Sequence, residues 1–151
     1  RSTSSAASDV YKRQEQRAKV LERFEQAKLN MPISKQALKR WFSDGYLKSN
    51  PEIYAQFMKT LNKKPEDHLN FLKAYKLFAN YVDDIEMIKK IKTKTLVMTG
   101  SDDLGSTVAM SKSLTKDLIN SNFIEISNGK HLCSIECADN VNMQIKRFIN
   151  N

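Results

Sequence analysis

The sequence is poor in cysteine, glycine and proline, and it contains no long apolar run. The only two cysteines, Cys133 and Cys137, are too few for the disulfide framework of a small secreted domain. This cysteine usage is typical of a reducing compartment, so we expect the protein to be cytoplasmic. No apolar stretch approaches the roughly 20 residues that a helix needs to cross a bilayer, so we expect no membrane partner.

The overall composition is that of an ordinary soluble globular protein, with 151 residues of which 40% are hydrophobic and 28% are charged. A net charge of +8 raises the question of a polyanionic partner. Most of the basic residues are lysines spread along the chain, without the arginine-rich clusters and interleaved aromatics that nucleic-acid binders use. We interpret the charge as a solvated lysine-rich face and expect no nucleic-acid partner.

Residues 1–14 do not have the pattern of a folded protein. The segment Ser4–Gln14 is rich in small polar residues, has no apolar period, and resembles a translated transposase adapter of the kind used in sequencing libraries. We therefore expect residues 1–14 to be a non-native, adapter-like tail and the natural reading frame to be interrupted at Glu15. A natural disordered tail is the alternative interpretation.

The region from Glu15 to Ile91 has a helical pattern. Apolar residues recur at a spacing of three or four positions, and the start signals are Ser34, the pair Asn50-Pro51 and Pro65. The pattern predicts four or five short helices without a strand, forming a bundle or lid (cap) region over residues 15–91. Its aromatic residues are expected to pack in the core. On the last long helix the residues expected to face inward are Leu69, Phe71, Leu72, Tyr75 and Phe78.

The pattern changes over residues 92–151. Thr95–Met98 is a short apolar run ended by Gly100, as expected of a buried strand, and Phe123–Ile126 indicates a second strand. A helical period lies between them, and another follows the second strand. Strand, helix, strand, helix predicts two parallel strands with a right-handed crossover. Because two parallel strands alone do not make a stable sheet, we expect an α/β fold whose natural context is a larger doubly wound sheet.

Polar residues follow both predicted strands at the point where each strand ends. Asp102 and Asp103 come after the first strand, and His131 comes after the second. Ligands meet the carboxyl ends of parallel strands, so these side chains are expected at one edge of the sheet. An acid that orients a histidine base is two-thirds of a nucleophile-activating relay. His131 alone is more simply read as a turn histidine, but the carboxylate in the corresponding loop favours the catalytic interpretation.

Two segments carry a resemblance to a known family. Lys94–Asp103, with an acid three residues after Gly100, resembles the strand-and-acid motif of α/β-hydrolases. Gly129–Leu132 followed by Glu136 resembles the catalytic-histidine segment of the same superfamily. The resemblance implies a Ser-His-Asp catalytic triad. It selects Asp103 rather than Asp102 as the acid, and the histidine of the second segment as the base.

The helical region resembles one branch of that superfamily. Lys39–Phe42, followed by Pro51-Glu52, is similar to the lid of 3-oxoadipate enol-lactonases. The resemblance implies that the parent enzyme is a carboxylic ester hydrolase acting on a small ester or enol-lactone, with no cofactor and no metal. The positive charge weakly favours an anionic substrate. Trp41 on the lid is a candidate substrate-binding residue, with lid core as the alternative.

The chain departs from the family at several places. Leu104–Thr107 and Ala138 stand where members often have proline, which affects loop rigidity more than proton chemistry. The larger departure is the missing nucleophile elbow, Gly-x-Ser-x-Gly, because no two of the 4 glycines are four positions apart. We therefore expect a C-terminal fragment of a serine hydrolase, inactive alone, whose serine and oxyanion hole lie upstream of Glu15. A relative that has lost its serine is the alternative.

Other sites and functions compete with this interpretation. Gly100–Gly105 has the position of a phosphate-binding loop but lacks its lysine, and the acids inside it lack the further ligands of a metal site. Cys133 and Cys137 do not have zinc-site spacing and are expected to be buried thiols, while His68 is expected to face solvent on a lid helix. The competing functions are a non-catalytic basic helical interaction module and a different α/β-hydrolase activity, haloperoxidase-like or carbon–carbon bond hydrolase.

Overall fold

The computed structural model describes residues 17–25, 33–61, 65–81 and 84–150. The predicted adapter-like tail of residues 1–14 lies outside these ranges, and so does the side chain of His68. The chain divides into two compact units. The first unit comprises Arg1–Ile33 and Lys59–Val82, and the second comprises Ser34–Met58 and Asp83–Asn151.

In the first unit, residues 17–25 are helical and pack through Phe24 against α5 (Pro65–Asn80), which begins at the predicted proline. The rings of Phe24 and Tyr75 meet edge to face, 5.8 Å apart between their centroids, and Ala79 is buried beside the aromatic residues. Among the described residues of this unit, α5 therefore buries only one face.

The prediction that α5 turns five apolar residues inward is wrong for three of them. Leu69, Phe71 and Phe78 are 60%, 44% and 61% exposed. The rings of Phe71 and Phe78 stack on Tyr75 of the same helix, with centroid distances of 5.5 Å and 5.9 Å. An apolar stripe identifies the face of a helix that prefers burial, but the partner that covers it is a tertiary feature which a local period does not specify.

The second unit contains α3 (Asp44–Ser49), α6 (Ile85–Ile88) and most of two further helices, α2 (Ile33–Trp41) and α4 (Pro51–Leu61). The predicted start at Asn50-Pro51 is confirmed. Ser34 was expected to cap α2, but the helix already includes Ile33, because cap signals locate a helix start only to within one or two residues. The short α3 was not predicted. Its cap is Ser43, whose hydroxyl accepts a hydrogen bond from the amide of Tyr46 at 3.2 Å.

The core of this helical part centres on Phe42, which is fully buried. Its ring stacks on Tyr46 with the centroids 5.4 Å apart and meets Phe57 edge to face at 5.2 Å. Ala37 and Leu38 of α2 are each 1% exposed. Phe42 therefore fixes the chain between α2 and α3, which matters below because this segment contacts the histidine loop.

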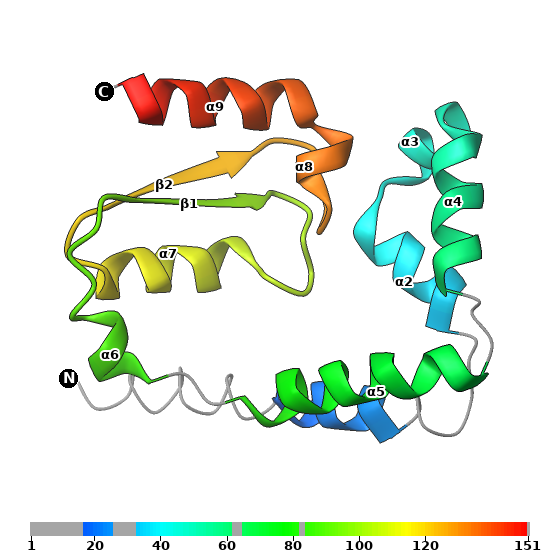
Figure 1. Ribbon diagram of the computed structural model, residues 1–151. Helices are drawn as coiled ribbons and strands as arrows, with labels where there is room; N and C mark the ends of the chain where they lie inside the picture. The colour runs from blue at the N-terminus through cyan, green and yellow to red at the C-terminus, as the bar shows by residue number, and fades with distance from the viewer. Residues whose placement is uncertain (1–16, 26–32, 62–64, 82–83, 151) are drawn as a thin grey trace. The chain divides into compact units, whose positions relative to one another are not determined.

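The α/β part has the predicted parallel pair of strands. β1 (Thr95–Gly100) and β2 (Ser121–Ile126) pair in parallel, with α7 (Val108–Asp117) as the crossover between them. The short α8 (Cys133–Glu136) and the longer α9 (Ala138–Asn150) follow β2. Figure 1 shows α7 on one side of the two strands and α9 on the other. The alternation of strands and helices on two faces confirms the α/β class.

The carboxyl ends of the two strands are held unusually close together. The amides of Ser101 and Asp102 donate to the carbonyls of Ile126 and Gly129, each at 2.9 Å. A Cβ atom at position 100 would collide with the backbone carbonyl of Gly129, so only glycine allows this approach. The loops that follow β1 and β2 consequently leave the sheet side by side.

None of the described helices has the length and apolar character of a membrane span.

We expect Gly100→Ala to loosen the two loops. The added methyl group has no room, and overpacking of this kind costs about 1–3 kcal/mol, so the amides of Ser101 and Asp102 should exchange with solvent roughly tenfold faster or more. Hydrogen exchange followed by NMR measures this directly. Gly45→Ala is the matched control, because position 45 in α3 has open space around it. Equal exchange rates in wild type and Gly100→Ala would show that the close approach is absent.

Candidate active site

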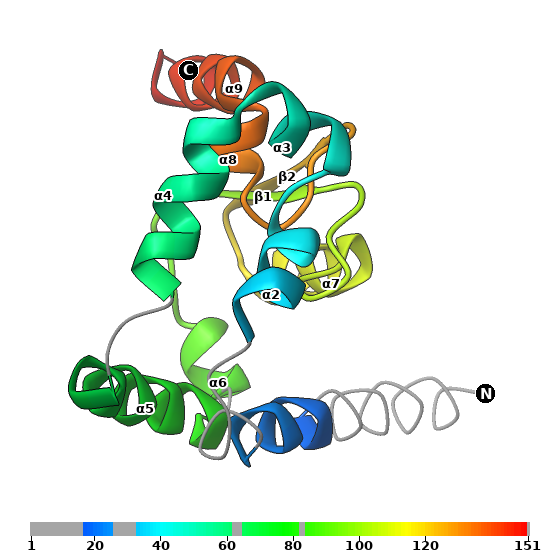
Figure 2. The same ribbon diagram turned by 90° about the vertical axis from the view of Figure 1, so that its right-hand side faces the viewer.

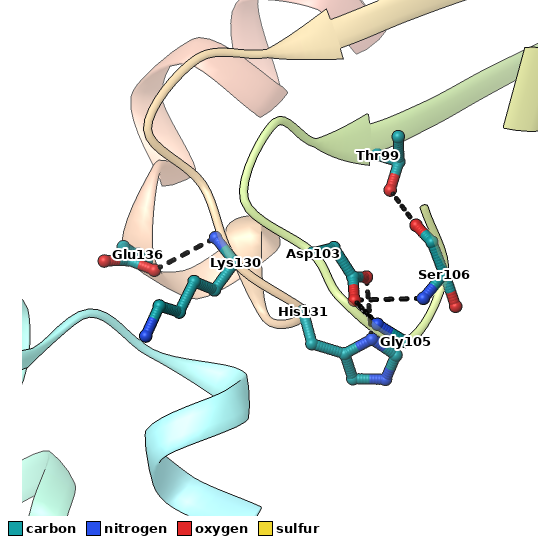
Figure 3. Close-up of polar contacts among 7 residues, drawn as sticks. All are labelled: Thr99, Asp103, Gly105, Ser106, Lys130, His131 and Glu136. Carbon is teal, nitrogen blue, oxygen red and sulfur yellow. Dashed lines mark hydrogen bonds and ion pairs between the residues drawn. The ribbon is translucent and has the colours of Figure 1, made fainter. Parts of the chain in front are cut away.

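A buried carboxylate and an exposed imidazole meet at the carboxyl edge of the strands. Oδ2 of Asp103, after β1, lies 2.8 Å from Nδ1 of His131, after β2 (Figure 3). The side chain of Asp103 is 4% exposed and that of His131 is 42% exposed. The two residues that the sequence placed in corresponding loops are therefore within hydrogen-bonding distance.

The carboxylate is oriented by its own loop. Oδ1 of Asp103 accepts hydrogen bonds from the backbone amides of Gly105 at 2.7 Å and Ser106 at 3.0 Å. The buried hydroxyl of Thr99, near the end of β1, donates to the carbonyl of Ser106 at 2.7 Å and ties this loop to the strand. With Oδ1 held by two backbone donors, Oδ2 remains to receive the imidazole.

The contact defines which ring nitrogen of His131 is available. An ionised carboxylate only accepts hydrogen bonds, so a neutral imidazole facing Asp103 carries its proton on Nδ1. Nε2 then holds a lone pair, and in Figure 3 it points away from Asp103. This arrangement presents a base to a reacting group on the open side of the ring.

Asp102 takes no part in this contact. It is exposed, and its Oδ1 accepts a hydrogen bond at 3.0 Å from the hydroxyl of Ser101. That hydroxyl in turn accepts from the amide of Asn128 at 2.9 Å, which links the acid loop to the turn before the histidine. The structure thus brings Asp103, not its neighbour, to His131.

Trp41 lies next to the histidine loop through its backbone. Its carbonyl accepts a hydrogen bond from the amide of Leu132 at 3.0 Å. Its half-buried ring meets Phe57 edge to face with centroids 6.0 Å apart. A role of the indole in substrate binding therefore stays a prediction, whereas the carbonyl contributes to the position of the loop.

Sequence reasoning did not foresee the contacts of Glu136, which it used only as a marker of the histidine segment. Its Oε1 accepts from the amide of Ser43 at 3.1 Å, and its Oε2 accepts from the amide of Lys130 at 3.4 Å. Buried polar groups usually have hydrogen-bond partners, but the sequence does not show which residues supply them. Ser43 lies 93 positions away, so spacing alone did not identify it.

The two cysteines are half-buried free thiols, Cys133 as the first residue of α8 and Cys137 directly after its end. Burial raises the pKa of the Cys133 thiol above its ordinary value, and the negative charge of Asp103 raises it further. Burial also raises the pKa of Cys137, with Glu136 as the next cause. Within the described part of the chain, no three His, Cys, Asp or Glu side chains are grouped so that they could hold a metal ion.

The fold is shared with solved α/β-hydrolases. An enol-lactonase from Burkholderia xenovorans LB400 matches with a TM-score of 0.76 and 21% identity over 87% of this chain and 50% of its own. A thermophilic esterase from Thermogutta terrifontis matches with a TM-score of 0.72 and 18% identity over 90% of this chain and 50% of its own. A meta-cleavage product hydrolase from Pseudomonas fluorescens IP01 matches with a TM-score of 0.59 and 18% identity over 80% of this chain and 46% of its own.

The chain therefore has the fold of the C-terminal part of an α/β-hydrolase, and it spans about half the length of the structures it matches. No protein-family model and no curated protein matches the sequence.

We expect Asp103→Asn to change the tautomer of His131. The carboxamide can turn its NH₂ group toward Nδ1, which removes the reason for a proton there. Ring ¹⁵N shifts at alkaline pH report which nitrogen is protonated. Asp102→Asn is the control, since Asp102 contacts Ser101 and not the ring. If the His131 tautomer changes in Asp102→Asn but not in Asp103→Asn, Asp102 and not Asp103 is the acid that contacts the ring.

We also expect Asp103→Asn to lower the pKa of the Cys133 thiol. The negative charge opposes thiolate formation, so its removal favours the thiolate, although burial keeps the pKa elevated. In a Cys137→Ser background, alkylation of Cys133 by iodoacetamide should reach its half-maximal rate at a lower pH when Asp103 is neutralised. A rate profile that moves to higher pH instead would contradict the arrangement of charges.

Proposed function

We propose that Asp103 and His131 are the acid and the general base of a Ser-His-Asp hydrolase whose serine lies outside these 151 residues. The observation that carries the proposal is the 2.8 Å contact between a buried, fully oriented carboxylate and an imidazole that is open on its other side. The α/β-hydrolase fold supports it, because in this fold the acid and the histidine follow the last strands in that order.

Each residue then has a defined role in acyl transfer. The serine attacks a carbonyl carbon while Nε2 of His131 takes its proton, and the same nitrogen later delivers a proton to the leaving group. Asp103 keeps Nδ1 protonated and stabilises the imidazolium that forms. In this proposal, backbone N–H groups outside these 151 residues hold the oxyanion.

We propose a small ester or enol-lactone as the substrate class. The similarity to an enol-lactonase and to an esterase supports this choice, and the net charge of +8 favours an anionic substrate. In this proposal residues 15–91 are the helical lid (cap) region, residues 92–151 belong to the hydrolase core, and Trp41 lines the substrate pocket. We expect a cytoplasmic enzyme that needs neither a cofactor nor a metal.

Two other functions remain as competitors. Carbon–carbon bond hydrolysis uses the same acid and histidine positions, and one of the matched structures is a meta-cleavage product hydrolase. A non-catalytic helical module would have no use for the oriented Asp103–His131 pair. That pair, with three hydrogen bonds on one buried carboxylate, favours the enzyme.

The decisive experiment compares the 151-residue chain with the product of the gene that includes the codons upstream of Glu15. We expect the chain alone to show no hydrolysis of p-nitrophenyl acetate above background, because it has no Gly-x-Ser-x-Gly elbow. The longer product should carry an elbow and hydrolyse the ester. In it, His131→Ala and Asp103→Asn should each lower kcat by about 10²–10⁴-fold.

Asp102→Asn in the longer product is the matched control and should retain activity close to wild type, since Asp102 does not touch the imidazole. An active enzyme indifferent to both His131→Ala and Asp103→Asn would refute the assignment. Turnover by the 151-residue chain that disappears in His131→Ala would refute the requirement for an upstream serine.

A further inference from the structure

The geometry points to Glu136 as a positioning residue for His131, a role that rests on the proposed function of the histidine. Glu136 does not touch the imidazole. Its two carboxylate oxygens bind one amide from the histidine loop, that of Lys130, and one from the start of α3, that of Ser43. The carboxylate thus bridges two segments that are far apart in sequence, as Figure 3 shows for its contact with Lys130.

The residues on both sides of the histidine donate backbone hydrogen bonds, one within the histidine segment and one to a segment far away in sequence. The residue before it, Lys130, gives its amide to Glu136, and the residue after it, Leu132, gives its amide to the carbonyl of Trp41 at 3.0 Å. Among the described residues, the side chain of His131 hydrogen-bonds to Asp103. The hydrogen bonds of its two neighbours fix the backbone position from which the ring reaches Asp103.

The histidine loop is attached to the C-terminal end of α2. The carbonyls in the last turn of α2 lack partners within the helix, and the histidine loop supplies donors to two of them. Nζ of Lys130 donates to the carbonyl of Lys39 at 2.8 Å, beside the bond from Leu132 to Trp41. The next residue, Phe42, is fully buried, which anchors the segment that the loop is attached to. Figure 2 shows the chain between α2 and α3 beside α8.

A charged acceptor suits this position. Glu136 receives two backbone N–H groups that would otherwise be half-buried without a partner, and a carboxylate accepts both at once. Glutamine offers one oxygen and places an NH₂ group against the other donor. The charge and the shape of the carboxylate are both required for the complete bridge.

The test compares Glu136→Ala and Glu136→Gln with the wild-type 151-residue chain by NMR. We expect two changes in Glu136→Ala. The fraction of His131 protonated on Nδ1 at alkaline pH should fall, and the amide of Lys130 should exchange roughly two- to tenfold faster, because it loses its 3.4 Å hydrogen bond to the carboxylate. Glu136→Gln should be intermediate in the tautomer, which rescues part of the signature.

Glu86→Ala is the matched control, because Glu86 is an exposed carboxylate that pairs only locally with Lys89. It should leave both readouts unchanged, and His68 serves as an internal reference for the ring signals. If Glu136→Ala does not fold, as judged by circular dichroism, the glutamine variant decides. It should show a reduced Nδ1–H fraction together with faster exchange at Lys130.

The outcomes separate the two proposals. An unchanged His131 tautomer in a folded Glu136 variant, even with faster exchange at Lys130, would overturn the positioning role and leave the proposed function intact. A wild-type chain in which His131 is not protonated on Nδ1 lacks the bond to Asp103, and this result would overturn both. A reduced Nδ1–H fraction in the Glu136 variants with wild-type behaviour in Glu86→Ala supports the positioning role.

Discussion

The site depends on how closely the carboxyl ends of β1 and β2 approach each other. Gly100 packs against the backbone of Gly129, and amide-to-carbonyl bonds from Ser101 and Asp102 join the two loops at that point. Asn128 adopts a left-handed conformation with φ of 59°, which turns the chain directly before the glycine. Both loops start from one fixed place. Asp103, three residues after β1, and His131, five residues after β2, therefore meet within hydrogen-bonding distance.

Each carboxylate oxygen of Asp103 and Glu136 has at least one hydrogen-bond partner. The buried carboxylate of Asp103 receives two backbone amides and the imidazole, and the half-buried carboxylate of Glu136 receives two amides from separate segments. Buried acceptors without donors cost about 1–3 kcal/mol each, so such matching restricts the loops to one arrangement. A base whose orientation is set before substrate binds loses little entropy in the reaction.

The sequence allowed the parallel strands and the shared edge to be predicted, because short apolar runs alternate with helical periods and parallel strands end on the same side. The choice of Asp103 over Asp102 came from a family resemblance rather than from spacing. Features set by tertiary contacts escaped prediction: α3 and α8 are too short to show a period, and Ser43, one partner of Glu136, is remote in sequence. The exposure of Leu69 and Phe78 escaped it too, since a stripe does not reveal what covers it.

The proposed function requires that His131, held by Asp103, serves a serine supplied by another part of the protein. A crystal structure of the longer gene product after reaction with an organophosphate ester can show this serine. We expect phosphorus on a serine Oγ next to Nε2 of His131, with Nδ1 of the same ring hydrogen-bonded to Asp103. A labelled serine remote from His131, or an imidazole turned away from Asp103, would contradict it.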